Sequence, residues 1–186
     1  MAPTINSPNV ENYFIGKGIV YVADVGTPFT SPIDTNVWRD VGNVPELELT
    51  PNVERLDHFS SRVGTRLKDR SVVLEVGGTL RIVLEEGTAA NFALALLGDV
   101  DEAAVGGPEV TLFSNVDISK ALWFVGASEI GAKADLKLNR VDFAPSSGIN
   151  FIGSDDWGNM EVEGELTAVN GVFGTLKITN VSDVVS

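Results

Sequence analysis

Short stretches in which apolar and polar residues alternate recur along the 186-residue chain, separated by turns rich in glycine and proline. Alternation with a period of two places successive side chains on opposite faces of a β-strand, so the pattern predicts a mainly β protein. The predicted strands cover residues 18–25, 44–51, 71–86, 108–115, 121–128, 133–143, 159–169 and 171–181.

The phase of the alternation predicts which side chains face the core. Residues 46–49 read Glu-Leu-Glu-Leu, which predicts inward leucines and outward carboxylates. In the last strand we expect Leu176 and Ile178 to point inward. A change of phase near Arg140 predicts a β-bulge. The glycine pair at 77–78 fits two interpretations, a hairpin turn or a bulge within one long bent strand.

Three further segments depart from the strand pattern. Residues 88–98 predict one helix, with Thr88 as its N-cap and Gly98 as its left-handed C-terminal residue. Such an apolar helix has to pack on the sheet. Residues 1–17 predict an N-terminal arm, and its first part is rich in Asn, Pro and Ser. Residues 52–70 are polar and lack a period, which predicts an unusually long loop.

Composition narrows the classes of function. The chain has 13 Lys and Arg against 26 Asp and Glu, a net charge of −13, which argues against binding a phosphate backbone through clustered cations. It has no cysteine, which excludes disulfides, thiolate catalysis and the usual structural zinc sites. We see no cationic and apolar leader and no run of about 20 apolar residues, so we expect a soluble protein made in the cytoplasm.

Candidate catalytic chemistry is sparse. The one histidine, His58, lies in the charged segment beside Phe59, so we favour a surface contact role over a Ser-His-Asp triad. The glycine pairs lack the Gly-Lys-Ser/Thr of a phosphate loop. Residues 155–159 could offer oxygen ligands to calcium, but they lack the alternating acidic spacing of a calcium loop and favour a turn. We predict no catalytic residue, no cofactor and no metal ligand.

The charges are distributed unevenly. Residues 55–70 hold five basic and two acidic side chains, a balance of +3, which leaves −16 on the rest of the chain. A basic segment on an acidic body favours head-to-tail contacts between copies. A solvated loop with an excess of arginines by chance is an equal alternative. The candidate contact residues are Arg55, His58, Phe59, Arg62, Arg66, Lys68 and Arg70.

A row of carboxylates follows one predicted strand. Glu161, Glu163 and Glu165 share a face opposite Met160 and other apolar residues, and Glu46 and Glu48 form a similar pair. Like charges on neighbouring positions of one face repel each other, so a row without opposite charges suggests a function. An ordinary acidic solvent face is the alternative interpretation.

The order of these features resembles the major tail protein family of long-tailed bacteriophages. The strand GIVYVADV at 18–25, the strand ELELTP at 46–51 and the polar stretch DHFSSRVGTRLKD at 57–69 carry the resemblance, with the long strand and helix that follow. It covers nearly the whole chain.

The resemblance implies a single tail-tube domain over residues 1–186. Its fold would be a β-sandwich or partial barrel with one flanking helix, an N-terminal arm and a long inter-strand loop. Six subunits form a ring, and rings stack into a hollow tube around a tape-measure protein, with tail-terminator and tail-tip proteins at its ends. The genome later passes through the tube without specific binding. The long loop usually reaches an adjacent ring, and no family motif is catalytic.

On this basis we expect a structural virion protein that is made in the host cytoplasm. The contact residues named above would join rings. We place Glu161, Glu163 and Glu165 on the lumen wall, with Glu46 and Glu48 as second choices, since an acidic wall would keep DNA mobile.

The alternative interpretation is another phage or bacterial β-protein that binds a partner. A head-tail connector, a capsid decoration protein and a carbohydrate-binding module all belong to this class. A carbohydrate module needs an exposed aromatic platform. We expect Trp123 in the core, which leaves Trp38 and Trp157 as weak candidates.

Overall fold

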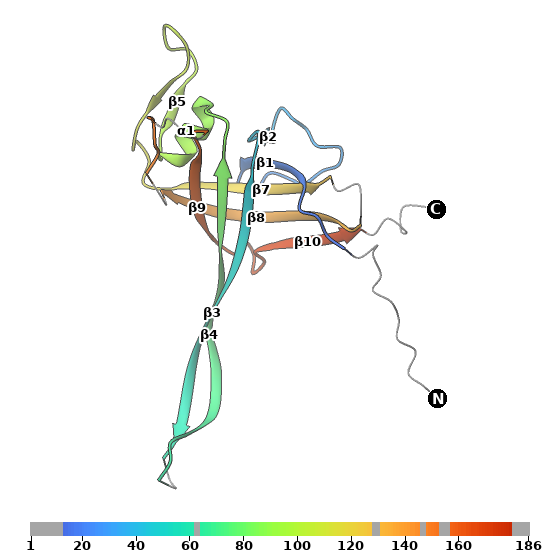
Figure 1. Ribbon diagram of the computed structural model, residues 1–186, viewed down its shortest axis with the longest axis vertical. Helices are drawn as coiled ribbons and strands as arrows, with labels where there is room; N and C mark the ends of the chain where they lie inside the picture. The colour runs from blue at the N-terminus through green and yellow to red at the C-terminus, as the bar shows by residue number, and fades with distance from the viewer. Residues whose placement is uncertain (1–12, 62–63, 128–130, 146–147, 153–156, 180–186) are drawn as a thin grey trace, which may run out of the picture.

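One large antiparallel β-sheet dominates the fold (Figure 1). The structure is a computed structural model that describes residues 13–61, 64–127, 131–145, 148–152 and 157–179. Within these residues the sheet has eight strands in the order β2-β1-β7-β8-β9-β4-β3, and β10 pairs with β8. The strands are β1 (Gly18–Asp24), β2 (Arg39–Asp40), β3 (Glu46–Ser60), β4 (Leu67–Leu84), β7 (Ile118–Gly126), β8 (Lys133–Pro145), β9 (Met160–Leu166) and β10 (Gly174–Thr179).

The sheet bends at β8. Residues 133–138 of this strand pair with β10, whereas residues 141–145 pair with β9. The register of β8 against β7 shifts at residues 139–140, which confirms the bulge predicted near Arg140. Figure 1 shows β7, β8 and β10 running across β3, β4 and β9. The sheet therefore wraps around a core, but it does not close into a barrel, because no described pairing joins β2 to β3.

The core lies in the bend of the sheet. Leu80, Leu122, Val141 and Val162 are fully buried there and come from four different strands. The α-helix α1 (Ala89–Ala95) adds its buried Leu94 to the same cluster. Burying an aliphatic side chain of this size contributes roughly 1.5–3 kcal/mol. The predicted combination of a β-core and one flanking helix is confirmed.

The helix begins as predicted and ends differently. The Thr88 hydroxyl accepts the backbone N–H of Asn91, which confirms Thr88 as the N-cap. Leu97, with φ of 49°, is the left-handed residue at the C-terminus, and Gly98 follows it and donates to Ala93 O at 2.8 Å. A side chain at 98 would lie 2.7 Å from the Thr111 carbonyl oxygen. This glycine is thus explained by a close approach rather than by its φ angle.

A small hairpin packs beside α1. It consists of β5 (Asp99–Asp101) and β6 (Glu109–Thr111), which form a two-stranded sheet of their own. Together with α1 it forms one end of the molecule in Figure 1. The strand predicted over 108–115 is therefore confirmed only for its first half.

The structure differs from the sequence-based expectation in the last strand and at the N-terminus. Leu176 and Ile178 were expected inside, but they are 60% and 51% exposed, because β10 is a peripheral strand that pairs only with β8. Residues 13–17 of the predicted arm are joined to the body, since Tyr13 O accepts Ala132 N and Lys17 O accepts Ala127 N. Residues 1–12 lie outside the described residues.

Candidate functional site

A two-stranded hairpin projects far beyond the rest of the sheet (Figure 1). We call residues 51–78 the hairpin arm, because the pairing of β4 with β9 stops at Thr79 and Glu165. From Pro51 opposite Gly78 to the end of β3, the arm's described strands pair only with each other. The strand β4 runs without a break through the glycine pair, so the interpretation as a hairpin turn at 77–78 is wrong.

The long irregular loop predicted over 52–70 is also wrong. These residues belong to β3 and β4, apart from the short tip of the arm, of which residues 62–63 lie outside the described residues. Two register shifts leave Leu74 and Asp69 as extra residues in β4. Each extra residue interrupts the period of two. In β3 the pattern is lost because both faces of the arm are exposed, so burial selects neither face.

Part of the arm's charge is neutralised across the hairpin. The His58 Nδ1 atom lies 2.6 Å from Asp69 Oδ1, and Lys68 Nζ lies 2.7 Å from Asp57 Oδ1. The Ser71 hydroxyl also donates to Asp57, at 2.6 Å. The hydrogen bonds from Lys68 and then Ser71 hold the pKa of Asp57 below its usual range. Two of the predicted contact residues, His58 and Lys68, thus have partners within the arm.

The arginines of the arm are less constrained. Among the described residues, no ion pair joins Arg55, Arg66 or Arg70 to a carboxylate. The Arg66 guanidinium lies 4.6 Å from the centroid of the Phe59 ring, a cation–π contact. Arg62 lies outside the described residues. Guanidinium groups in this setting can bind carboxylates of another molecule through two hydrogen bonds.

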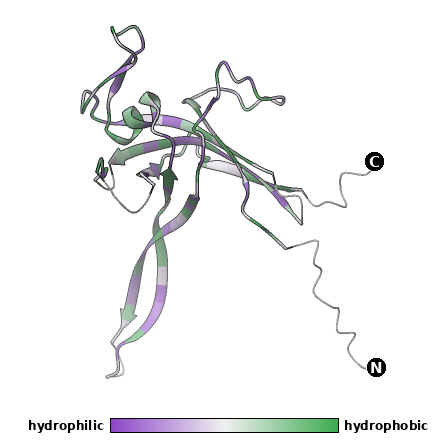
Figure 2. Cartoon of the chain, turned by 45° about the horizontal axis from the view of Figure 1, so that its top comes forward, coloured by the Kyte–Doolittle hydropathy of each residue, from purple (hydrophilic) through white to green (hydrophobic). Residues whose placement is uncertain are grey.

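Apolar side chains are exposed on the same arm. Leu56, Leu67 and Leu74 are 60%, 64% and 56% exposed, and Figure 2 shows apolar and polar residues mixed along both strands. An isolated two-stranded hairpin is at best marginally stable in water. Exposed apolar residues beside unpaired strand edges are typical of an interaction surface.

The five predicted glutamates lie on one face of the sheet. Register pairs Glu48 with Arg81 and Arg81 with Glu163, which places these three side chains in one row across β3, β4 and β9. The rest of this face carries Glu46, Glu161, Glu165 and, opposite Glu165 on β8, Asp142. We call this surface the acidic face. Its other side is the apolar core.

One arginine interrupts the acidic row. Arg81 donates from Nε and Nη2 to the two carboxylate oxygens of Glu161, both at 2.8 Å, and its Nη1 atom lies 2.7 Å from Glu46 Oε1. These hydrogen bonds raise the pKa of Arg81 and lower that of Glu161. The cross-strand pairing also removes the repulsion between the two glutamates. Among the described residues, Glu48, Glu163 and Glu165 are the members of the predicted five that form no ion pair on this face.

A second polar cluster lies at the β8 side of the acidic face. The Asp142 carboxylate accepts hydrogen bonds from Ser119 Oγ, Thr167 Oγ1 and Arg140 Nε, at 2.5, 2.5 and 2.7 Å. Burial pushes the pKa of Asp142 upward, but the three hydrogen bonds outweigh it, and the pKa lies below its usual range. The acidic face thus combines six carboxylates with Arg81 and Arg140, a net charge of −4.

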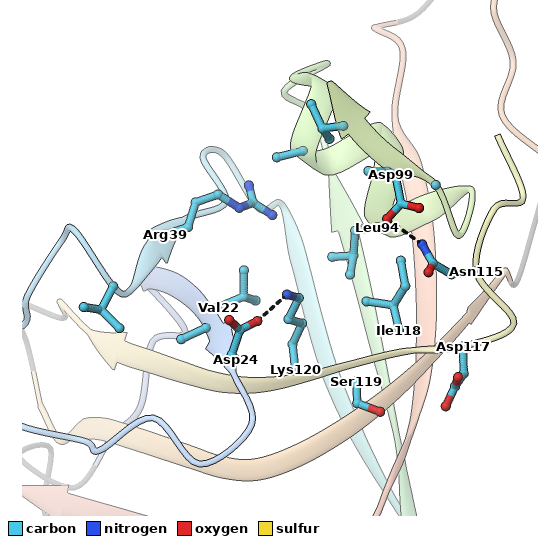
Figure 3. Close-up of a pocket in the computed structure, with 16 residues that line it drawn as sticks. Val22, Asp24, Arg39, Leu94, Asp99, Asn115, Asp117, Ile118, Ser119 and Lys120 are labelled. Carbon is cyan, nitrogen blue, oxygen red and sulfur yellow. Dashed lines mark hydrogen bonds and ion pairs between the residues drawn. The ribbon is translucent and has the colours of Figure 1, made fainter. Parts of the chain in front are cut away.

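A cavity of about 490 Å³ lies between α1 and strands β1 and β7 (Figure 3). Most of its charged side chains have partners. Lys120 lies 2.6 Å from Asp24, and its hydrogen bond lowers the pKa of that carboxyl. Arg39 donates to Asn91 Oδ1 at 2.7 Å, and burial lowers the pKa of this arginine. The buried Asn91 is in turn held by two backbone carbonyls. The arrangement connects α1 to the sheet.

The aromatic residues separate into buried and exposed groups. Trp38 and Trp123 are 1% and 3% exposed and pack with Phe29. This confirms Trp123 as core and places Trp38 there as well. Trp157 is 88% exposed and lines another cavity, of about 370 Å³, together with Glu46 and other residues of the acidic face.

The described residues contain neither a candidate metal site nor a helix that could span a membrane. No group of three His, Cys, Asp or Glu side chains lies close enough to hold a metal ion. No helix is long and apolar enough to cross a lipid bilayer. Asp155 and Asp156 of the stretch at 155–159 lie outside the described residues, which resume at Trp157.

One family of proteins matches the chain by sequence. The family model described as "Protein of unknown function UCP028589" matches residues 13–111, more than half of the chain. The chain belongs to this family. No curated protein matches it. The segment shared with UCP028589 runs from the residues before β1 through β6, and it contains the whole hairpin arm and α1. The family description carries no activity over to the chain.

Sequence reasoning missed the residues that join the acidic face together. Arg81 lies between the buried Leu80 and Ile82, so the alternation predicts that its side chain points outward, but its partners depend on strand order. Asp142 follows the bulge near Arg140, and its partners come from β7 and from the residue after β9. Strand order and register supply these contacts, and local patterns do not.

Proposed function

We propose that this chain is the structural subunit of a bacteriophage tail tube. In this proposal hexameric rings stack into a hollow tube with an acidic lumen that conducts the genome during infection. The observation that carries the proposal is the hairpin arm, which extends residues 51–78 away from the core with exposed apolar and cationic side chains. In a monomer such an extension lowers stability, because its apolar side chains remain in water. A neighbouring subunit that covers the extension would restore stability.

Free strand edges support lateral assembly into rings. Among the described residues, β3 and β2 end the strand order, and β3 offers a long unpaired edge. Soluble monomers usually shield such edges, because backbone N–H and C=O groups there can pair with another chain. In the proposed ring each subunit covers the edge of the next, and closure of the ring leaves no edge free.

The acidic face supports a wall that does not retain DNA. A protein binds the phosphate backbone when its cations displace condensed counterions. Here Glu48, Glu163 and Glu165 face the same side, and Arg81 is occupied by Glu46 and Glu161. A surface of this kind repels the backbone. In the proposal these five glutamates line the lumen.

The remaining parts of the proposal follow from the resemblance to phage major tail proteins. The partners are further copies of the chain, a tape-measure protein within the tube, and terminator and tail-tip proteins at its ends. DNA passes without specific binding. The protein is made in the host cytoplasm and then becomes part of the virion.

Self-association of the purified chain tests this function. We expect sedimentation velocity at micromolar concentration to show ring-sized species or larger, and negative-stain microscopy to show hollow tubes. A matched variant with residues 53–76 replaced by a two-residue turn should remain folded and form no tubes. Monomers at every salt concentration, including after seeding with preformed phage tubes, would overturn the proposal.

A second candidate function rests on Trp157. An exposed tryptophan beside polar side chains, here Glu85 and Asn159, is a common way to bind a sugar ring. This arrangement favours a carbohydrate-binding module among the alternatives. Titration of a glycan array with the wild-type protein and a Trp157→Ala variant separates the two functions. Glycan binding by monodisperse monomers, lost in the variant, would support the second.

A further inference from the structure

We infer that the hairpin arm of one copy docks on the acidic lobe of a second copy, where the acidic lobe is residues 85–117, the segment that contains α1, β5 and β6. The inference rests on the proposed function, because it requires copies of the chain to assemble. It goes further by naming the surface that receives the arm.

The first argument is position. The arm and the acidic lobe lie at opposite ends of the long axis of the molecule (Figure 1). One strand, β4, connects them, since it starts at the tip of the arm and ends shortly before α1. A copy displaced along this axis therefore brings the arm of one molecule to the lobe of the next. This geometry is head-to-tail and can repeat without limit along the axis.

The second argument is charge. The acidic lobe has no lysine or arginine, and its acidic side chains are Glu85, Glu86, Asp99, Asp101, Glu102, Glu109 and Asp117. The segment 55–70 of the arm has a balance of +3. No ion pair within the described residues involves a carboxylate of the lobe, and none involves Arg55, Arg66 or Arg70. Each surface therefore carries charged side chains that form no ion pair within the described part of the chain.

The third argument is apolar exposure at both ends. On the lobe, Phe113 is 68% exposed and Val116 is 95% exposed. On the arm, Leu56 and Leu67 are exposed to a similar degree. Surface ion pairs alone contribute little because water and salt screen them. Apolar contact would supply most of the affinity, and the charges would set which surfaces meet.

The acidic face competes less well for the arm. Its carboxylates surround Arg81 and Arg140, and Glu46, Glu161 and Asp142 are already engaged by those arginines. A second guanidinium would meet the positive charge of Arg81 there. On the lobe, the exposed Glu102 and Glu109 form no ion pair among the described residues, so they are better electrostatic partners for the arm.

Charge exchange between the two surfaces tests the inference. We expect Arg55→Glu with Arg70→Glu, and separately Glu102→Lys with Glu109→Lys, each to weaken self-association at least about tenfold. A chain with all four changes, or an equimolar mixture of the two double variants, should recover it. The matched control is Lys133→Glu with Lys177→Glu, which changes two exposed cations outside both surfaces and should assemble like the wild type. Circular dichroism verifies that every variant is folded.

Label transfer locates the contact directly. Since the chain has no cysteine, benzophenone maleimide can be attached at Leu56→Cys alone, with Thr175→Cys as the control position. We expect the label at 56 to cross-link to peptides from 85–117 of another molecule, identified by mixing isotopically light and heavy protein. The control label should not reach that segment.

The outcomes separate the two proposals. Tubes that form normally from the Glu102→Lys, Glu109→Lys variant would overturn the docking on the lobe and leave the tube function standing. Cross-linking of the label at position 56 to the acidic lobe, in protein that forms no tubes, would support the contact and overturn the tube function. The inference would also be overturned if the variant with all four charge reversals did not recover self-association and the label at position 56 cross-linked to other segments. Monomers without transfer would overturn both.

Discussion

Single residues of this chain act through pairing across strands. Arg81 holds Glu46 and Glu161 together, and Asp142 collects three donors from different parts of the chain. A hydrogen bond to a charged group contributes roughly 1.5–3 kcal/mol where water is excluded, and less where it is not. Both clusters lie on the side of the sheet away from the core, so they fix the relative positions of β3, β4, β8 and β9.

Replacement of Asp142 tests this effect. We expect Asp142→Asn to lower the free energy of unfolding by about 1–2 kcal/mol at pH 7, because Arg140 loses its charged partner and the hydroxyl donors lose their strongest acceptor. The pKa of Asp142 is depressed in the folded state, so its contribution is present above the ordinary aspartate pKa of about 3.9 and disappears as the pH falls through the folded value. Urea denaturation at pH 7 and pH 3 measures both effects.

The control for this prediction is Asp117→Asn, an exposed carboxylate of the acidic lobe. It should change the unfolding free energy by less than about 0.5 kcal/mol. If the deficit of Asp142→Asn persisted unchanged at pH 3, the loss would not come from the charge of this carboxylate.

At the scale of elements, the sequence predicted strands that bury one face, together with caps and bulges that depend on local residues. The cap at Thr88, the first strand and the bulge near Arg140 all follow from local residues and are confirmed. The arm was missed over residues 52–70 because neither of its faces is buried in one chain, so this part of its strands carries no regular apolar and polar alternation. The exposure of Leu176 was missed because a pattern shows which residues share a face and cannot show whether anything covers it.

Two glycines allow a matched test of element packing. We expect Gly98→Ala to destabilise the protein by about 1–3 kcal/mol, because its Cβ would lie 2.7 Å from the Thr111 carbonyl oxygen and 2.8 Å from Val110 Cγ1. Gly77→Ala is the control, because no atom lies within 4 Å of the Cβ position there. It should leave stability unchanged or raise it slightly. Thermal unfolding followed by circular dichroism gives the comparison, and equal effects of the two changes would contradict the close packing of β6 on the end of α1.

At the scale of the whole molecule, three surfaces face different directions. The arm extends from one end of the long axis, the acidic lobe closes the other end, and the acidic face covers one side of β3, β4 and β9 (Figure 1). A monomeric protein gains nothing from this separation. A subunit that repeats along an axis around a channel uses all three, which is why we propose a tube. The charge pattern was visible in the sequence, and its division among three surfaces required the fold.

Inversion of charge on the acidic face tests its role in the proposed lumen. We expect Glu48→Lys, Glu163→Lys and Glu165→Lys together to leave assembly intact, because these glutamates form no ion pair among the described residues. Glu161 is kept to preserve its pair with Arg81. Tubes of this variant should retain double-stranded DNA with an affinity that falls steeply with salt, and wild-type tubes should not. Fluorescence anisotropy of labelled DNA over a range of salt concentrations measures this. Equal DNA binding by both would contradict a lumen formed by the acidic face.

A cryo-electron microscopy reconstruction of the purified, self-assembled chain tests the central proposal most directly. We expect a hollow tube of stacked rings in which each hairpin arm crosses to the next ring and the acidic face lines the channel. Absence of any tube, with the protein remaining monomeric at high concentration, would contradict it.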